Sequence, residues 1–145
     1  MTGSEAAERY IAFLEAMTPA DLDRLSEFCV PDVRFRDPFN DVTGVEAYRA
    51  VLAKMFEDTG QPDFVVTGRA VTGEWLYLRW RFVASGPGGK RLWIEGMSEI
   101  RFDAPGDARG KVISHFDFWD AGQVYERIPV LRSLVGLVKR RLSIG

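Results

Sequence analysis

The sequence predicts an α+β fold in which helices come first, a meander of antiparallel strands follows, and one more helix ends the chain. Apolar residues recur at helical spacing in residues 5–17 and 45–58. From residue 64 onward, segments with strand-like alternation are separated by short turns rich in glycine and proline. A last helical stripe begins near residue 128. A twisted antiparallel sheet can curl over such helices and enclose a pocket on its inner side.

The length and composition are those of one soluble globular domain. We expect the 145 residues to form a single domain, 1–145, with a core over about residues 5–120 and a helical extension over 121–145. The net charge of −2 gives no overall basic field, which argues against a nucleic-acid partner. The single cysteine, Cys29, excludes an internal disulfide and a cysteine-based zinc site. This low cysteine content predicts a reducing, cytoplasmic location. We expect no metal, because one histidine and scattered carboxylates do not form a ligand set. We also expect neither a signal peptide nor a spanning segment, because the N-terminus is acidic and its apolar residues are interrupted.

The N-terminal region should contain helices around one short strand. After the helix at 5–17, Thr18-Pro19-Ala20-Asp21 suits a second helix start, and Pro31 should end that helix. A short strand is expected at Val33–Asp37, because the proline after Asp37 cannot donate to a ladder. Thr43-Gly44-Val45-Glu46 matches a capping box and should open the helix that runs to about Asp58.

Four strands are expected over Phe64–Val71, Trp75–Ala84, Arg91–Phe102 and Lys111–Trp119. In the second of them, placing apolar side chains inward would turn Trp80 and Phe82 toward the core. The alternative would turn Arg79 inward and would suggest an anionic ligand.

The last strand carries an unusual face. Period two places Ile113, His115, Asp117 and Trp119 on the same side. This side combines a large aromatic residue, the only histidine of the chain and a carboxylate. It either faces water or lines a cavity, and periodicity alone leaves both possibilities open.

The C-terminal tail predicts an amphipathic helix that is basic at its end. Its apolar stripe consists of Val130, Leu131, Leu134, Val135, Val138 and Leu142. Lys139, Arg140 and Arg141 lie where cations favour a helix C-terminus. We expect the stripe to pack on the body. A lid over the pocket mouth is the next alternative, and a weak membrane-surface contact is a third, although we expect no stable membrane association.

Three segments carry a resemblance to a known family, namely Glu8-Arg9-Tyr10-Ile11-Ala12, Ala20-Asp21-Leu22-Asp23 and Phe35-Arg36-Asp37-Pro38. Their order and spacing resemble the nuclear transport factor 2-like superfamily, which includes SnoaL-like polyketide cyclases and ketosteroid isomerases. The resemblance extends to about Asp120. It implies a cone-shaped, curved antiparallel sheet wrapped around the N-terminal helices, a cystatin-like roll, and a homodimer formed through the outer sheet face.

The resemblance also implies roles for particular residues. Tyr10 falls on the oxyanion donor of ketosteroid isomerases and Asp37 on their general base. Ser98 stands where those enzymes have a protonated aspartate as second donor. His115 and Asp117 would transfer protons inside the cavity. The expected substrate-binding residues are Trp119, Ser98, Trp80 and Phe56.

The function implied is that of a cofactor-independent isomerase, cyclase or hydrolase that uses acid/base catalysis on a small apolar molecule, cyclic or carbonyl-bearing. The alternative is a non-catalytic ligand-binding or dimerisation module of the same fold. Each candidate residue also has a structural alternative. Asp37 could solvate a turn, Tyr10 could be a core aromatic, and His115 and Asp117 could shape the pocket wall.

Overall fold

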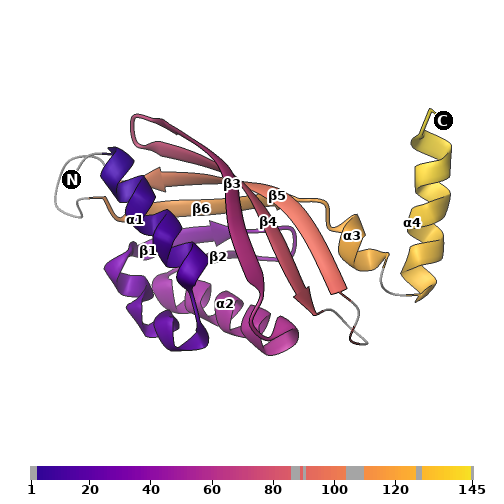
Figure 1. Cartoon of the computed structure of the whole chain (residues 1–145), viewed down its shortest axis with the longest axis horizontal. Coiled ribbons are helices and arrows are strands. Elements are labelled where there is room, and N and C mark those ends of the chain that lie inside the picture. The colour runs from indigo at the N-terminus through magenta and orange to yellow at the C-terminus, as the bar shows by residue number, and fades with distance from the viewer. Residues whose placement is uncertain (1–2, 86–88, 90, 104–109, 127–128, 145) are drawn as a thin grey trace.

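The computed structural model describes residues 3–85, 89, 91–103, 110–126 and 129–144 and has the predicted α+β architecture (Figure 1). In chain order the elements are α1 (Gly3–Ala16), the 3₁₀-helix η1 (Pro19–Glu27), β1 (Cys29–Arg36), β2 (Asp41–Thr43), α2 (Val45–Thr59), β3 (Asp63–Thr72), β4 (Trp75–Ser85), β5 (Arg91–Phe102), β6 (Val112–Trp119), α3 (Gly122–Tyr125) and α4 (Pro129–Leu142).

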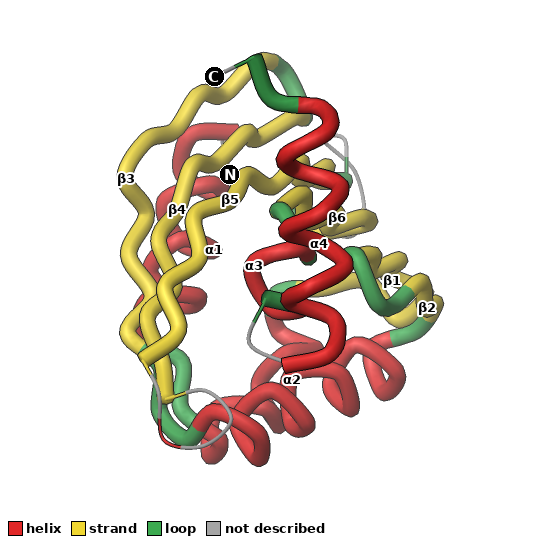
Figure 2. The backbone as a smooth tube through the Cα atoms, turned by 90° about the vertical axis from the view of Figure 1, so that its right-hand side faces the viewer, coloured by secondary structure: helices red, strands yellow, loops and turns green. Residues whose placement is uncertain are grey.

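The sheet contains the predicted meander and extends it on one side. Strands β3, β4, β5 and β6 pair in sequence order, and every neighbouring pair is antiparallel. Strand β1 adds parallel to β6, and the short β2 adds antiparallel to β1. A parallel pair needs a long crossover, which the chain between β1 and β6 supplies. The resulting mixed sheet curls without closing, with β3 at one edge and β2 at the other (Figure 2).

Local details differ from the sequence prediction in the N-terminal half. The second helix is a 3₁₀-helix, and β1 begins at Cys29 rather than after Pro31. A register shift between Cys29 and Arg34 interrupts the β1–β6 ladder where the exposed Pro31 stands, which explains how a strand contains a proline. The predicted capping box is also wrong. Thr43 ends β2, and the N-cap of α2 is Gly44, whose φ of 107° favours glycine.

The core lies between the concave face of the sheet and the N-terminal helices (Figure 1). Its largest fully buried side chains come from helices and strands alike: Tyr10, Tyr48, Ile11, Leu25, Leu76, Leu78, Ile100, Val33, Val112 and Cys29. Burial raises the pKa of the Cys29 thiol to about 12. This cysteine is therefore an inert core residue and not a nucleophile.

The pairing register places inward-facing residues in rows that cross the sheet. The rows that form the inner wall are Phe35–His115–Ile100–Leu76, Asp117–Ser98–Leu78 and Trp119–Gly96–Trp80. Directly opposed residues on one face are close enough to interact. The register thus determines which polar side chains meet inside the fold.

The C-terminal helix α4 does not pack on the body, contrary to our expectation. Its main contacts are with the short α3, and it stands apart from the sheet in Figure 1. Its apolar side chains are accordingly exposed, with 56% of Leu134, 55% of Val138 and 77% of Leu142 accessible to solvent. An ion pair between Lys139 and Glu126 connects it to the end of α3.

Gly96 has no side chain, and in the row Trp119–Gly96–Trp80 the ring of Trp80 fills the space that a side chain would need. A larger residue at this position should therefore destabilise the fold. A Cβ atom at this position would lie 2.5 Å from Cζ2 of Trp80, whose ring is held by a hydrogen bond from Nε1 to Ser98 Oγ. We expect Gly96→Ala to lower the free energy of unfolding by about 1–3 kcal/mol, measured by urea denaturation. Gly136→Ala is the control, because a Cβ there meets nothing closer than 3.6 Å. Equal unfolding midpoints for Gly96→Ala and the wild type would contradict the prediction.

Candidate functional site

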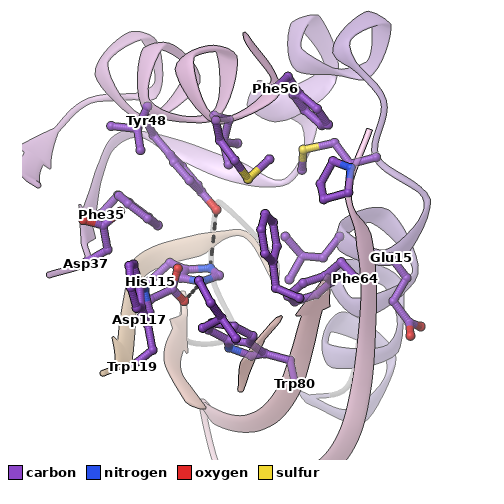
Figure 3. A pocket seen from close by; sticks show the side chains of 18 of the residues that line it. Glu15, Phe35, Asp37, Tyr48, Phe56, Phe64, Trp80, His115, Asp117 and Trp119 are labelled. Atoms are coloured by element: carbon purple, nitrogen blue, oxygen red, sulfur yellow. Dashed lines mark hydrogen bonds and ion pairs between the residues drawn. The ribbon is translucent and has the colours of Figure 1, made fainter. Parts of the chain in front are cut away.

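The site is built around His115 of β6, a histidine whose side chain is almost fully buried. Only 4% of the residue is exposed. Its Nε2 lies 2.7 Å from Oδ1 of Asp117 (Figure 3). Its Nδ1 lies 2.7 Å from the hydroxyl of Tyr10. Both ring nitrogens therefore have partners, as burial of an imidazole requires.

Further hydrogen bonds extend this pair into a chain. Beyond Asp117, Ser98 Oγ lies 2.5 Å from the same Oδ1 and accepts from Trp80 Nε1 at 2.8 Å. On the other side, the hydroxyl of Tyr48 lies 2.9 Å from that of Tyr10 and 3.4 Å from His115 Nδ1. The chain runs through six side chains, in the order Trp80, Ser98, Asp117, His115, Tyr10 and Tyr48.

Donors and acceptors in the chain assign the protonation states. With Asp117 ionised and His115 neutral, Ser98 and His115 Nε2–H both donate to Oδ1, Tyr10 donates to Nδ1, and Tyr48 donates to Tyr10. Every proton then has an acceptor. A protonated His115 would add a donor at Nδ1, and one tyrosine hydroxyl would lose its acceptor. The network therefore favours a carboxylate beside a neutral imidazole.

Strand geometry explains why these groups meet. His115 and Asp117 are two residues apart on β6 and point the same way, and Ser98 is the cross-strand partner of Asp117 on β5. The two tyrosines come from α1 and α2, which cover the same face of the sheet. With Trp80 of β4, which donates to Ser98, five elements contribute to one buried network.

This network forms part of the wall of a cavity of about 190 Å³ between the sheet and the helices. An apolar cavity of roughly 150 Å³ holds benzene, so this one suits a molecule of about one ring. Aromatic side chains make up much of its surface: Phe35, Tyr48, Phe64, Trp80, Phe82 and Trp119. Trp80 and Phe82 face inward, whereas Arg79 lies exposed on the other face. No lysine or arginine is among the described residues that line the cavity.

The titratable side chains of the cavity wall differ in their positions. Glu15 is exposed and accepts a hydrogen bond from the backbone N of Val66 at 3.0 Å. His115 and Asp117 lie together, and 20% of the Asp117 side chain is accessible. No described residue hydrogen-bonds Oδ2 of Asp117. In the part of the chain that the structure describes, no three His, Cys, Asp or Glu side chains could hold a metal ion.

The structure brings most of the predicted site residues to the cavity. Trp119, Trp80, Phe56, His115 and Asp117 line it directly. Ser98 lies behind Asp117, and Tyr10 lies behind His115, so neither of them is part of the cavity lining.

Asp37 borders the cavity, but its carboxylate is occupied in a turn. Oδ1 accepts from the backbone N of Phe39 and of Asn40, both at 2.8 Å, and from Asn40 Nδ2 at 3.1 Å. Oδ2 accepts from the same Nδ2 at 3.2 Å. These bonds shape the connection between β1 and β2 in the way that aspartate commonly shapes turns.

Tyr48 is a site residue that the sequence analysis missed. It belongs to the apolar stripe of α2, and its spacing there is that of an ordinary core residue. Its chemistry could have indicated a role in the site, because a tyrosine buried in the core needs a hydrogen-bond partner for its hydroxyl. Burial, together with nearby ionisable groups, raises the pKa of both Tyr10 and Tyr48 well above the usual value of 10.0. Both hydroxyls therefore stay protonated.

Comparison with known proteins agrees with this architecture. The family model of the SnoaL-like domain matches residues 10–115, and no curated protein matches the chain. Among solved structures, a protein described as a SnoaL-like polyketide cyclase from Jannaschia sp. CCS1 superposes with a TM-score of 0.73 at 21% identity, over 87% of this chain and 90% of that one.

Two further solved structures carry other descriptions. AclR, described as a hydroxylase from Streptomyces galilaeus, has a TM-score of 0.67 at 17% identity over 88% of this chain and 96% of its own. A Catenulispora acidiphila protein with a ketosteroid isomerase-like fold, in complex with trimethylamine, has a TM-score of 0.68 at 14% identity. The superposition covers 83% of this chain and 89% of that one. These likenesses establish the shared fold.

The raised pKa values of Tyr10 and Tyr48 predict a loss of stability at high pH. A folded-state pKa above the unfolded value of 10.0 favours the native state below that pH, and this contribution falls as pH rises beyond it. We expect these two phenols to ionise only as the protein unfolds. Phenolate absorbance and circular dichroism, recorded together for the wild type and for Tyr10→Phe/Tyr48→Phe, isolate their contribution. Ionisation of the pair near pH 10 in a native protein would refute this.

Proposed function

The chain belongs to the SnoaL-like family, and we propose that it is a cofactor-independent enzyme that moves a proton on a small apolar molecule, cyclic or carbonyl-bearing. The observation that carries the proposal is the environment of Asp117. Its Oδ1 is held by Ser98 and His115, while its Oδ2 has no partner among the described residues and the side chain faces an apolar cavity. A carboxylate fixed in this way can act as a general base on a carbon acid.

The proposed reaction is proton transfer beside a carbonyl group. Asp117 Oδ2 takes a proton from the carbon next to the carbonyl, and the C–H electron pair becomes the double bond of an enolate. The carboxylic acid then returns the proton to the same or another carbon of the ligand, which restores Asp117. His115 keeps the carboxylate oriented and donates to it throughout, so it acts as a positioning residue.

We assign the oxyanion donor to Tyr48 rather than to Tyr10. Tyr48 lines the cavity, whereas Tyr10 lies behind His115. The Tyr48 proton can turn from Tyr10 toward a ligand oxygen without leaving any other proton of the network unpaired. The Tyr10 proton cannot, because His115 Nδ1 would lose its donor.

Asp37, the base suggested by the resemblance, is better suited to a structural role. Its Oδ1 already accepts three hydrogen bonds within its own turn. Proton uptake by this carboxylate would weaken each of those bonds, since they are strongest to the charged form.

Size and charge of the cavity define the ligand class. About 190 Å³ encloses roughly one ring, so a larger substrate would insert only one of its rings. Asp117 is negative and no described arginine or lysine lines the cavity, so an anionic ligand is disfavoured. Trimethylamine, with which the Catenulispora acidiphila protein forms a complex, is a small cationic probe that can be tested on this cavity.

The test of this proposal is hydrogen exchange into monocyclic ketones and enones in deuterated water, followed by NMR. We expect the wild type to exchange protons next to the carbonyl and Asp117→Asn to lose at least about a hundredfold in rate. Binding, measured through the fluorescence of the cavity tryptophans, should persist in that variant because the amide has nearly the same shape.

Asp37→Asn is the matched control, since it removes a carboxylate that borders the same cavity, and its exchange rate should change little. Unaltered exchange in Asp117→Asn, or loss confined to Asp37→Asn, would overturn the assignment of the base. Ligand binding without exchange in the wild type would instead favour the non-catalytic binding module.

We also propose that the chain forms a homodimer through the outer sheet face. Support comes from large apolar side chains that are about half exposed there, with 51% of Trp93, 53% of Met97 and 49% of Phe118 accessible. Arginines lie over some of these rings, with Arg81 at 5.1 Å from Trp93 and Arg36 at 5.7 Å from Phe118. Aromatic residues, methionine and arginine are the types enriched in protein interfaces.

Light scattering tests the dimer. We expect twice the chain mass for the wild type and a monomer for Met97→Lys/Phe118→Lys, because two more cations would face the arginines of the partner. Ala12→Lys/Ala50→Lys adds the same charge at exposed helix positions and should stay dimeric. A monomeric wild type would refute the dimer.

A further inference from the structure

The C-terminal helix α4 presents an apolar face that the other described elements leave largely uncovered, since the main contacts of α4 are with the short α3. Leu131, Leu134, Val135, Val138 and Leu142 recur along it at intervals of three and four residues, the spacing of one helix face. Leu134, Val138 and Leu142 are mostly exposed. None of the described helices is long and apolar enough to cross a membrane, so such a face can at most lie along a surface.

The charge of this helix has one sign. Arg140 lies opposite the apolar face, Arg132 and Lys139 flank that face on one side, and Arg141 flanks it on the other. No aspartate or glutamate occurs from residue 129 to the end of the sequence. The partner of α4 must therefore offer apolar surface and negative charge together.

The body of the protein does not offer that combination. The outer sheet face is apolar, but its arginines outnumber its carboxylates, so it is not negative overall. Glu95 and Glu99 lie there on β5. The arginines of the same face are Arg34, Arg36, Arg79, Arg81, Arg91 and Arg101. The exposed surface of α1 and η1 is acidic but polar, and the apolar residues of these helices are turned into the core. A second copy of the chain offers only these same surfaces.

We propose that α4 binds the surface of a bilayer that contains anionic lipid, with its apolar face in the acyl-chain boundary and its cations at the headgroups. Helices that combine one apolar face with lysines and arginines bind membranes in this way. Binding through four cations on a short helix is reversible and salt-sensitive. The proposal is independent of the reaction assigned to Asp117.

The position of α4 determines which end of the protein would face the bound membrane. Helix α3 joins α4 to the end of β6, and its Tyr125 lies 6.0 Å, between ring centroids, from the exposed Phe39. Phe39 in turn lies 5.4 Å from Trp119 of the cavity wall. Exposed aromatic side chains therefore lie between α4 and the cavity, and aromatic rings favour the membrane–water interface. A bilayer bound by α4 would face this end of the molecule.

Flotation of the full chain with phosphatidylcholine vesicles, with and without phosphatidylserine, tests the proposal. We expect binding only to the anionic vesicles and its loss at high salt. Each cation near an anionic surface contributes about fivefold in affinity, and Lys139 is already paired with Glu126. Lys139→Gln/Arg140→Gln/Arg141→Gln should therefore weaken binding by about twenty-fivefold or more. Arg24→Gln/Arg49→Gln/Lys54→Gln removes the same charge from the body and should bind like the wild type.

Leu134→Ser/Val138→Ser separates an amphipathic helix from a merely basic one, because it keeps every charge and should still lose binding. Circular dichroism should show an intact core in all variants, since α4 lies outside it. Absence of wild-type binding to anionic vesicles would overturn the proposal. Two other results would also overturn it, namely that Leu134→Ser/Val138→Ser leaves vesicle binding unchanged but alters the oligomeric mass, or that it alters ligand affinity instead. A change in mass would mean that a second copy covers the helix, and a change in ligand affinity would mean that the helix covers the chain's own cavity.

Discussion

The architecture of the site depends on satisfying both nitrogens of one buried imidazole. Leaving either nitrogen of His115 without a partner would cost about 1–3 kcal/mol, so its surroundings are constrained on two sides. Asp117 meets Nε2 from the same strand, and Tyr10 meets Nδ1 from a helix that is far away in sequence. The placement of α1 over the sheet and the register of β6 are therefore coupled, because a shift of one residue in β6 would turn the histidine to the outer face.

This coupling divides the interior into an apolar cavity and a polar wall behind it. Trp80 belongs to both, since its ring lines the cavity while its Nε1 donates to Ser98. The polar groups satisfy one another almost completely, which is how a low-dielectric interior tolerates them. Within the network, Oδ2 of Asp117 is the carboxylate oxygen that has no hydrogen-bond partner among the described residues. The hydrogen-bond network therefore ends at this atom, beside the cavity.

Much of this could be predicted from the sequence where one periodicity dominates. The alternation in residues 113–119 placed His115, Asp117 and Trp119 together, and the apolar pattern of β4 turned Trp80 inward. The resemblance identified the fold, which the family match and the solved structures confirm. The sequence did not distinguish site residues from structural residues where both have the same spacing or the same local motif. Tyr48 has the spacing of a core residue, and the hydrogen bonds of Asp37 depend on backbone geometry that composition does not encode.

Elements that lack a periodic signal were also missed. Strand β2 and helix α3 have only three and four residues, too few to show a repeat. The unpacked position of α4 could not be read from its stripe, because an apolar helix face has the same pattern whether it meets protein or lipid. The parallel alignment of β1 with β6 is a tertiary property that neither strand specifies alone.

That parallel pair has a consequence for how the chain folds. The meander and the helices are built from contacts between neighbours in sequence, but β1 must find β6 across most of the chain, and the hydrogen bond between Tyr10 and His115 spans 105 residues. Contacts of such separation form late and slow the rate-limiting step, since their loop-closure entropy is lost before they stabilise anything. In a nascent chain, the edges of β1 and β5 would stay unpaired until β6, the last strand, is released. In that interval the side chains of the His115 network are solvated and unordered, so assembly of this network and closure of the aggregation-prone edges are the same kinetic event.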